Sequence, residues 1–230
     1  MTSSIKIISK EAYEKTRGKP NQEEVWDSIA HSWGEYRQKS IPLVAEFLQE
    51  KSGTVIDLGC GSGRNMIPSK KITYYGVDFS KNQMEQAKKY TKKNKIKARF
   101  IKSDITTLPK QIFKSEIFDY GLFIASLHCL ETAAKRKAAV AGLFRVLKPG
   151  AEALITIWNS DDKRFNAVDN HGSVYLSWKE EDREYFRYYY LFKKPELIRL
   201  LEEAGFSILE EYPREKDRFS RKNFIFRVKK

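Results

Sequence analysis

The stretch TVIDLGCGSG, residues 54–63, decides the fold of this chain. Its first half, from Val55 to Leu58, is apolar and rich in β-branched residues, which predicts a buried strand. Three glycines at alternate positions follow at once, and glycine permits positive φ and a close approach of the backbone to a ligand. The G-x-G-x-G spacing is neither the dinucleotide fingerprint nor a Walker loop. A strand that enters a glycine turn and then a helix still indicates a site for a nucleotide-like ligand.

The rest of the chain alternates apolar runs with helical segments. Strands are expected at 54–59, 73–78, 98–102, 118–125, 153–158, 206–212 and 222–229. Helices are expected at 61–68, 81–93, 132–147 and 195–204. Repeated β–α units followed by a terminal pair of strands predict an α/β fold: a mainly parallel seven-stranded sheet with one antiparallel strand and helices on both faces.

The domain organisation is expected to be simple. Residues 1–52 read as an N-terminal arm and helices, and residues 53–230 as the main α/β domain, with one structural domain overall. Asn21 is a suitable cap for a helix that begins at the next residue, and Pro42 opens a second helix. Residues 159–192 break the alternation, being polar at first and then aromatic and basic. A loop of this length inside a compact fold is usually functional, so this segment is interpreted as a substrate-binding insertion.

Acidic residues lie near the carboxyl ends of three of the expected strands. Asp57 lies just before the glycine turn, Asp78 ends the second strand and Asp104 follows the third. The carboxyl ends of parallel strands meet at one edge of a sheet, where α/β folds bind their ligands. The pattern D-x-G-x-G-x-G at this turn resembles the first motif of the Rossmann-like, class I S-adenosylmethionine-dependent methyltransferases. The alternative is an ordinary strand-to-helix turn.

This resemblance implies roles for the residues around the turn. Asp78 would accept both ribose hydroxyls, the alternative being a solvated carboxylate or a helix cap. Phe79 would pack on the adenine ring, and Asp104 with Ile105 would bind its amino group and a ring nitrogen. Asp57 either orders the glycine turn or contacts the ligand. The expected S-adenosylmethionine-binding residues are Asp57, Gly59, Cys60, Gly61, Gly63, Asp78, Phe79, Asp104, Ile105 and, as walls of the sulfonium pocket, Ile124 and Ala125.

Composition limits the class of protein. A hydrophobic content of 41% and an aromatic content of 13% are typical of a folded globular chain. The net charge of +13 suits a polyanionic partner such as nucleic acid, or else a lysine-rich solvated surface. Two cysteines make no disulfide framework, so a reduced, cytoplasmic setting is the simplest expectation. We expect no zinc site, no signal peptide and no transmembrane span.

Several further motifs resemble a narrower family, the tRNA wobble-uridine methyltransferases of eukaryotes and archaea. The resemblance runs from about residue 24 to 230. It rests on V-W-D-S-I-A-H at 25–31 with R-x-K at 37–39, on I-A-S-L-H at 124–128, on L-K-P-G through I-W at 147–158, and on R-Y-Y-Y-L-F at 187–192. Cys129 stands where that family usually has a second histidine, which puts any role for paired imidazoles in doubt.

The narrower resemblance implies a reaction and partners. The reaction is methyl esterification of 5-carboxymethyluridine at wobble position 34 of tRNA, with S-adenosylmethionine as methyl donor. The partners are tRNA and a small zinc-binding activator protein that covers an apolar surface of the catalytic subunit.

Four residues are candidates for the acceptor side. A carboxylate acceptor is ionised near pH 7, so it needs positioning and cations rather than a general base. Arg37 and Lys39 are expected to hold the acceptor, or to grip tRNA phosphates. His128 either hydrogen-bonds the acceptor or is a satisfied histidine at a strand end. Trp158 either stacks on the flipped base or packs in the core.

Two other classes of function compete with this reading. A small-molecule methyltransferase of quinone or biosynthetic type shares the fold but needs no excess positive charge. A non-catalytic RNA-binding or scaffold protein would not need the complete set of glycines and acids. Binding of S-adenosylmethionine and the methylation state of tRNA distinguish the three hypotheses.

Overall fold

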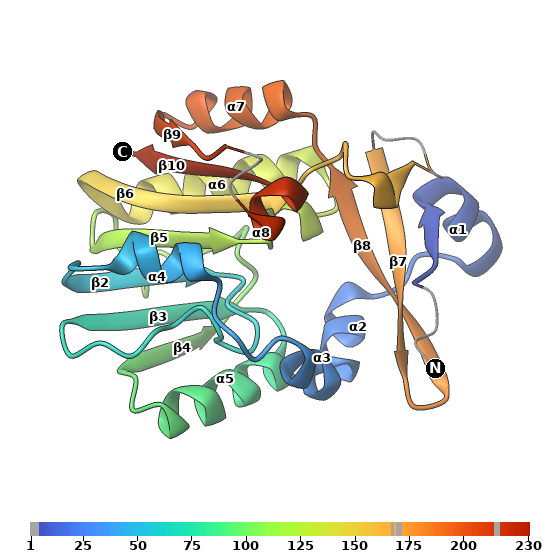
Figure 1. Cartoon of the computed structure of the whole chain (residues 1–230), viewed down its shortest axis with the longest axis horizontal. Helices are drawn as coiled ribbons and strands as arrows, with labels where there is room; N and C mark the ends of the chain where they lie inside the picture. The colour runs from blue at the N-terminus through green and yellow to red at the C-terminus, as the bar shows by residue number, and fades with distance from the viewer. Residues whose placement is uncertain (1–4, 167, 169–171, 214–216) are drawn as a thin grey trace.

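The computed structural model describes residues 5–166, 168, 172–213 and 217–230, and its centre is a seven-stranded sheet (Figure 1). The strand order is β4-β3-β2-β5-β6-β10-β9. The bounds are β2 (Gly53–Leu58), β3 (Ile72–Asp78), β4 (Ala98–Lys102), β5 (Phe118–Ile124), β6 (Leu147–Trp158), β9 (Ser207–Glu211) and β10 (Asn223–Lys229). The first five of these strands are parallel, and β10 runs antiparallel to both β6 and β9. The predicted sheet is therefore confirmed.

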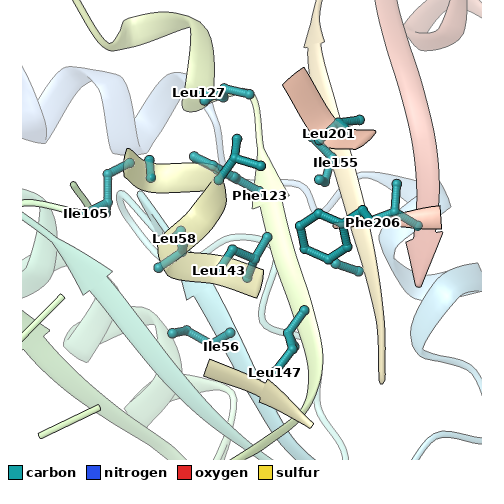
Figure 2. Packing of buried hydrophobic residues seen from close by; sticks show 14 of the residues in the cluster. Ile56, Leu58, Ile105, Phe123, Leu127, Leu143, Leu147, Ile155, Leu201 and Phe206 are labelled. Carbon is teal, nitrogen blue, oxygen red and sulfur yellow. The ribbon is translucent and has the colours of Figure 1, made fainter. Parts of the chain in front are cut away.

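Helices cover both faces of this sheet (Figure 1). One face packs against α6 (Ala133–Val146) and α7 (Lys194–Glu203), and Figure 2 shows its core, with Leu143 of α6 beside Ile56 and Phe123 of the sheet. The other face packs against α4 (Pro42–Leu48), α5 (Lys81–Lys93) and α8 (Arg218–Lys222). A sheet buried on both faces explains why its central strands are apolar throughout.

A second, three-stranded sheet stands at the carboxyl edge of the first one (Figure 1). It consists of β1 (Ile7–Ser9), β7 (Gly172–Glu180) and β8 (Arg183–Leu191), in the order β1-β7-β8. Helix α1 (Lys10–Arg17) covers it, and Tyr13 of this helix lies 4.5 Å from the ring of Tyr175 and 4.7 Å from that of Phe186. The expectation of a long loop over 159–192 was wrong. Its aromatic residues pair as strands because the N-terminal segment supplies a third strand and a helix to bury them.

Two other local expectations were also wrong. No helix forms over 61–68, where the chain runs through turns, because φ is positive at Gly61 (51°) and Gly63 (78°) and Pro68 follows after four residues. The segment 148–150 lies inside β6, which begins at Leu147, well before the strand expected at 153–158. The expected helix after Asn21 is confirmed as two short helices, α2 (Gln22–Ser28) and α3 (Ala30–Tyr36).

One glycine turn gives a direct test of the packing between α6, α7 and the sheet. Gly205 ends α7 with φ of 102°, and a Cβ there would lie 2.7 Å from the Phe144 ring. We expect Gly205→Ala to lower the free energy of unfolding by about 2–3 kcal/mol in urea denaturation, through strain and overpacking. The matched control is Gly18→Ala, at φ of 71° with nothing within 4 Å. An equal loss in both variants would show that φ alone sets the cost.

Candidate active site

A cavity of about 410 Å³ opens at the carboxyl ends of β2, β3 and β5. Nine residues predicted from the sequence line it: Gly59, Cys60, Gly61, Asp78, Phe79, Asp104, Ile105, Ile124 and Ala125. The strand ends bring these residues together because parallel neighbours finish at the same edge. The cavity thus contains most of the predicted cofactor-binding residues.

Asp78 organises the floor of this cavity. Its carboxylate is buried, and it accepts hydrogen bonds from the backbone N–H of Gly61 (2.8 Å) and of Ser80 (2.9 Å). Burial raises the pKa of Asp78 to about 6, although the two N–H donors favour the charged form. Ser80 in turn caps α5 and donates to Asp27 of α2 (2.5 Å), so the floor is joined to the N-terminal helices.

Two predicted residues lie behind the cavity instead of lining it. Gly63 packs against α5, where a Cβ would lie 3.0 Å from that of Ala87. Asp57 is buried in β2, and its Oδ2 has no hydrogen-bond partner among the described residues. Burial and the nearby charge of Asp78 raise the pKa of Asp57 to about 7. These positions favour the interpretation that Asp57 and Gly63 shape the glycine turn.

The structure also adds lining residues that the sequence did not single out. Asn65 and Gln83 are buried, and Asn65 Oδ1, Gln83 Oε1 and Gln83 Nε2 have no hydrogen-bond partner among the described residues. The segment 19–23 covers the cavity from the N-terminal side, and Lys19 Nζ lies 2.9 Å from Glu131 Oε2 on the opposite wall. Asn65 could have been predicted to line the cavity, because it follows the glycine turn by two residues. The segment 19–23 could not, because it is distant from the turn in the sequence.

The four residues predicted for the acceptor side lie outside the lining of the cavity. His128 is fully buried, with the ring of Trp158 4.9 Å away, and its Nδ1 accepts a hydrogen bond from the Trp158 backbone N–H (3.4 Å). Burial and the charge of Arg164 lower the pKa of His128 to about 3, so the imidazole is neutral. Trp158 also stacks on Tyr189 at 4.1 Å. At the following position, Cys129 lines the cavity in place of His128.

Arginines gather beside these rings and form what we call the arginine–aromatic cluster: Arg37, Arg164, Arg187, Trp33, Trp158 and Tyr189. The Arg37 guanidinium lies 5.0 Å from the Trp33 ring, and that of Arg187 lies 4.8 Å from it. Trp33 also lines the cavity, so the cluster and the cavity share a wall. Lys39, by contrast, is exposed.

Charge in this cluster is poorly compensated. Arg164 pairs with Asp162 at 3.0 Å, but within the described residues no carboxylate lies within ion-pair distance of Arg37 or Arg187. Arg37 Nε, Arg164 Nη2 and Arg187 Nε are buried and without a hydrogen-bond partner in the same part of the chain. Burial lowers the pKa of Arg37, as expected for a guanidinium that has lost water without gaining an anion.

Comparison with known proteins agrees with this geometry. A family model described as a methyltransferase domain matches residues 49–205. The tRNA (carboxymethyluridine(34)-5-O)-methyltransferase of Schizosaccharomyces pombe is 30% identical over 212 residues, which cover 81% of this chain and 89% of that protein. The chain belongs to the tRNA (carboxymethyluridine(34)-5-O)-methyltransferase family. The enzyme of the same name from Arabidopsis thaliana is 30% identical over 185 residues, but the match spans 44% of that longer protein.

Solved structures show that this methyltransferase shares its fold with many other methyltransferases. An S-adenosylmethionine-dependent methyltransferase from Methanosarcina mazei superimposes with a TM-score of 0.66 at 22% identity, over 84% of this chain and 98% of that one. The CcbJ methyltransferase from Streptomyces caelestis gives a TM-score of 0.70 at 16% identity, over 91% and 98%. The predicted class I methyltransferase fold is therefore confirmed.

S-adenosylmethionine is the cofactor of this methyltransferase, and the cavity fits it. The buried oxygen and nitrogen atoms of Asn65 and Gln83 without partners are suited to the polar tail of the molecule, and Asp78 to its ribose. Glycine is required at position 59 for the shape of this turn, because φ is 69° there and a Cβ would lie 2.5 Å from the Ser126 Cβ. Within the described residues no group of three or more metal-ligating side chains occurs, and no helix has the length and hydrophobicity that crossing a bilayer requires.

The buried Asp57 predicts how the stability of this methyltransferase depends on pH. Its folded pKa of about 7 exceeds the unfolded value near 4, so the folded state binds the extra proton. This contribution to stability is present below pH 4 and is lost as pH rises towards 7. We expect Asp57→Asn, without cofactor, to raise the free energy of unfolding at pH 8 by on the order of 2 kcal/mol, and to change it little at pH 4.5. Urea denaturation at both pH values measures this; the same shift at both would show that the ionisation of Asp57 is not the cause.

Proposed function

We propose that this methyltransferase esterifies the carboxylate of 5-carboxymethyluridine at wobble position 34 of tRNA. The observation that carries the proposal is the uncompensated charge of Arg37 and Arg187 next to the cofactor cavity. Arg37 is half-buried, and Arg187 is buried with hydrogen bonds only to the neutral Tyr189 hydroxyl and Ser177 carbonyl, so an anionic acceptor would supply the missing negative charge. Membership in the family named for this reaction supports the same acceptor.

The residue chemistry suits a carboxylate acceptor. S-adenosylmethionine supplies an electrophilic methyl group when bound. The acceptor carboxylate is already ionised near neutral pH, so no general base is needed. None of the acceptor-side residues is placed to act as a general base. His128 is neutral and buried, with a pKa near 3, so it takes up no proton at physiological pH. What remains for the protein is orientation of the carboxylate and exclusion of water.

Within this proposal the four acceptor-side residues have different tasks. Arg37 holds the carboxylate from beside Trp33, and exposed Lys39 contacts tRNA phosphate. Trp158 offers a ring for stacking of the extruded base. His128 acts as a positioning residue, because its Nδ1 is bonded to the Trp158 backbone and its ring supports the Trp158–Tyr189 stack.

The proposal includes partners and a compartment. It takes tRNA as the substrate, and a small zinc-binding activator protein as an additional subunit, as the family resemblance implies. Two free cysteines among the described residues, Cys60 and Cys129, are in keeping with a reducing, cytoplasmic setting.

Nucleoside mass spectrometry of tRNA tests the proposal. Purified protein, with and without the activator, is incubated with S-adenosylmethionine and tRNA that carries 5-carboxymethyluridine. We expect the methyl ester to appear at position 34, and to be missing from tRNA of a strain that lacks the gene. An unchanged tRNA in both experiments would overturn the proposal and favour a small-molecule acceptor.

A further inference from the structure

The positive charge of the chain is concentrated in one segment. Residues 70–97 carry nine lysines and two acidic residues, a net charge of +7 out of +13 for the whole chain. These lysines are all exposed: Lys70, Lys71, Lys81, Lys88, Lys89, Lys92, Lys93, Lys95 and Lys97. Within the described residues, one acid pairs with them, since Glu85 lies 2.7 Å from Lys88 Nζ. We call this set the α5 lysine face.

The fold brings these lysines onto one continuous surface. Five of them project from the exposed side of α5, whose thirteen residues span about 20 Å. The others lie at the far end of the helix, because Lys71 immediately precedes β3 and Lys97 immediately precedes the neighbouring strand β4. The Tyr74 N–H donates to the Lys97 carbonyl at 2.9 Å, which fixes the two strand starts side by side. The lysines therefore lie along α5 and around its C-terminal end (Figure 1).

The other end of this surface reaches the active site. Gln83 of α5 and Phe79 just before the helix line the cavity. Helices α2 and α3, which carry the cavity residues Trp26 and Trp33, pack against the same end of α5. A polymeric ligand that places one of its units in the cavity can therefore continue along α5 without leaving the protein surface.

Helix chemistry alone does not account for this pattern. Lysines in the last turn, Lys92 and Lys93, interact favourably with the helix dipole. Lys81 and Lys88 lie outside that turn, and like charges three or four residues apart, such as Lys88 and Lys92 or Lys89 and Lys93, destabilise a helix. A repelling face of this kind is stabilised when a polyanion neutralises it.

We propose that the α5 lysine face binds the phosphate backbone of the tRNA whose wobble nucleotide enters the cavity. The assignment rests on the proposed function for the identity of the nucleic acid. Charge complementarity and continuity with the cavity favour an RNA over an anionic membrane, which offers no unit for insertion into the active site. The expected contacts are to phosphates, so they add affinity without reading sequence.

The test compares two triple variants with equal change of charge. The first is Lys89→Glu, Lys92→Glu and Lys93→Glu on α5. The control is Lys110→Glu, Lys114→Glu and Lys193→Glu, three exposed lysines of the β4–β5 connection and the start of α7. The affinity for tRNA is measured at several salt concentrations, together with the affinity for S-adenosylmethionine and the melting temperature.

We expect the α5 variant to bind tRNA at least about tenfold more weakly at 0.1 M salt, and to reduce the slope of log K against log salt by roughly 2–3. The control should stay close to wild type, and both should keep their cofactor affinity. Equal losses in the two variants, no loss in the α5 variant, or a wild type that binds anionic vesicles through α5 but not tRNA would each overturn the inference. A wild type that binds tRNA through α5 but transfers no methyl group to it would overturn the proposed function and leave this surface standing.

Discussion

Replacing Arg37 with methionine is expected to lower kcat/KM for methyl transfer to tRNA by roughly a hundredfold to a thousandfold, because a buried charge pair would lose one partner. The affinity for S-adenosylmethionine should change by less than about twofold, since Arg37 lies outside the lining of the cofactor cavity. Methionine preserves the unbranched, apolar part of the side chain that packs near Trp33 and Tyr36. Radiolabelled methyl transfer and calorimetry give the two quantities.

Two further variants show whether position or charge matters. Lys39→Met removes an exposed cation two residues away, and we expect a loss of about tenfold or less. Arg183→Met removes an exposed arginine of β8 outside the cluster and serves as the matched control. Similar losses for Arg37→Met and Arg183→Met would contradict a specific role for the arginine–aromatic cluster.

Asp78→Ala should abolish cofactor binding, with the dissociation constant for S-adenosylmethionine raised by at least about a hundredfold. The substitution leaves the N–H groups of Gly61 and Ser80 without their acceptor, so the glycine turn and the start of α5 lose a common anchor. It also removes the carboxylate proposed for the ribose. Isothermal titration calorimetry measures the binding, and circular dichroism verifies the fold.

The isosteric Asp78→Asn separates these two contributions. Its amide oxygen can still accept one backbone N–H, so the turn keeps part of its support while the negative charge is lost. We expect an intermediate affinity. If Asp78→Asn binds the cofactor as the wild type does, the charge of Asp78 has no part in recognition.

The cofactor half of the site was predictable from local sequence, and the acceptor half was not. Gly59, Gly61, Asp78 and Asp104 lie at or within three residues of the carboxyl ends of strands, so their position at one edge follows from strand order alone. The burial of His128 depends on Trp158 and Tyr189, which are thirty or more residues away in the sequence. The pattern of polar and apolar residues around His128 carries no information about contacts with such distant residues.

The hairpin of β7 and β8 escaped prediction for a related reason. Its residues from Phe186 to Tyr189 are all buried, so the alternation of polar and apolar positions that reveals a half-exposed strand is missing. Gln22 contributes to that burial, since its side chain bonds the backbone of Phe186 and of Tyr188. These partners lie more than 160 residues upstream, beyond the range of any local pattern.

The pairing of β1 with β7 has a consequence for the order of folding. Ile7 lies opposite Leu176, so this contact closes a loop of about three quarters of the chain, and long loops are closed late because of their entropy. The seven-stranded sheet needs none of the residues of β1 or α1 for its own pairing. We therefore expect β1 and α1 to detach first under mild denaturant, which would expose Tyr175, Phe186 and Tyr188 while the strands around the cofactor cavity persist. Hydrogen exchange would then report two levels of protection in one domain, the lower one in β1 and α1 and the higher one in the seven-stranded sheet.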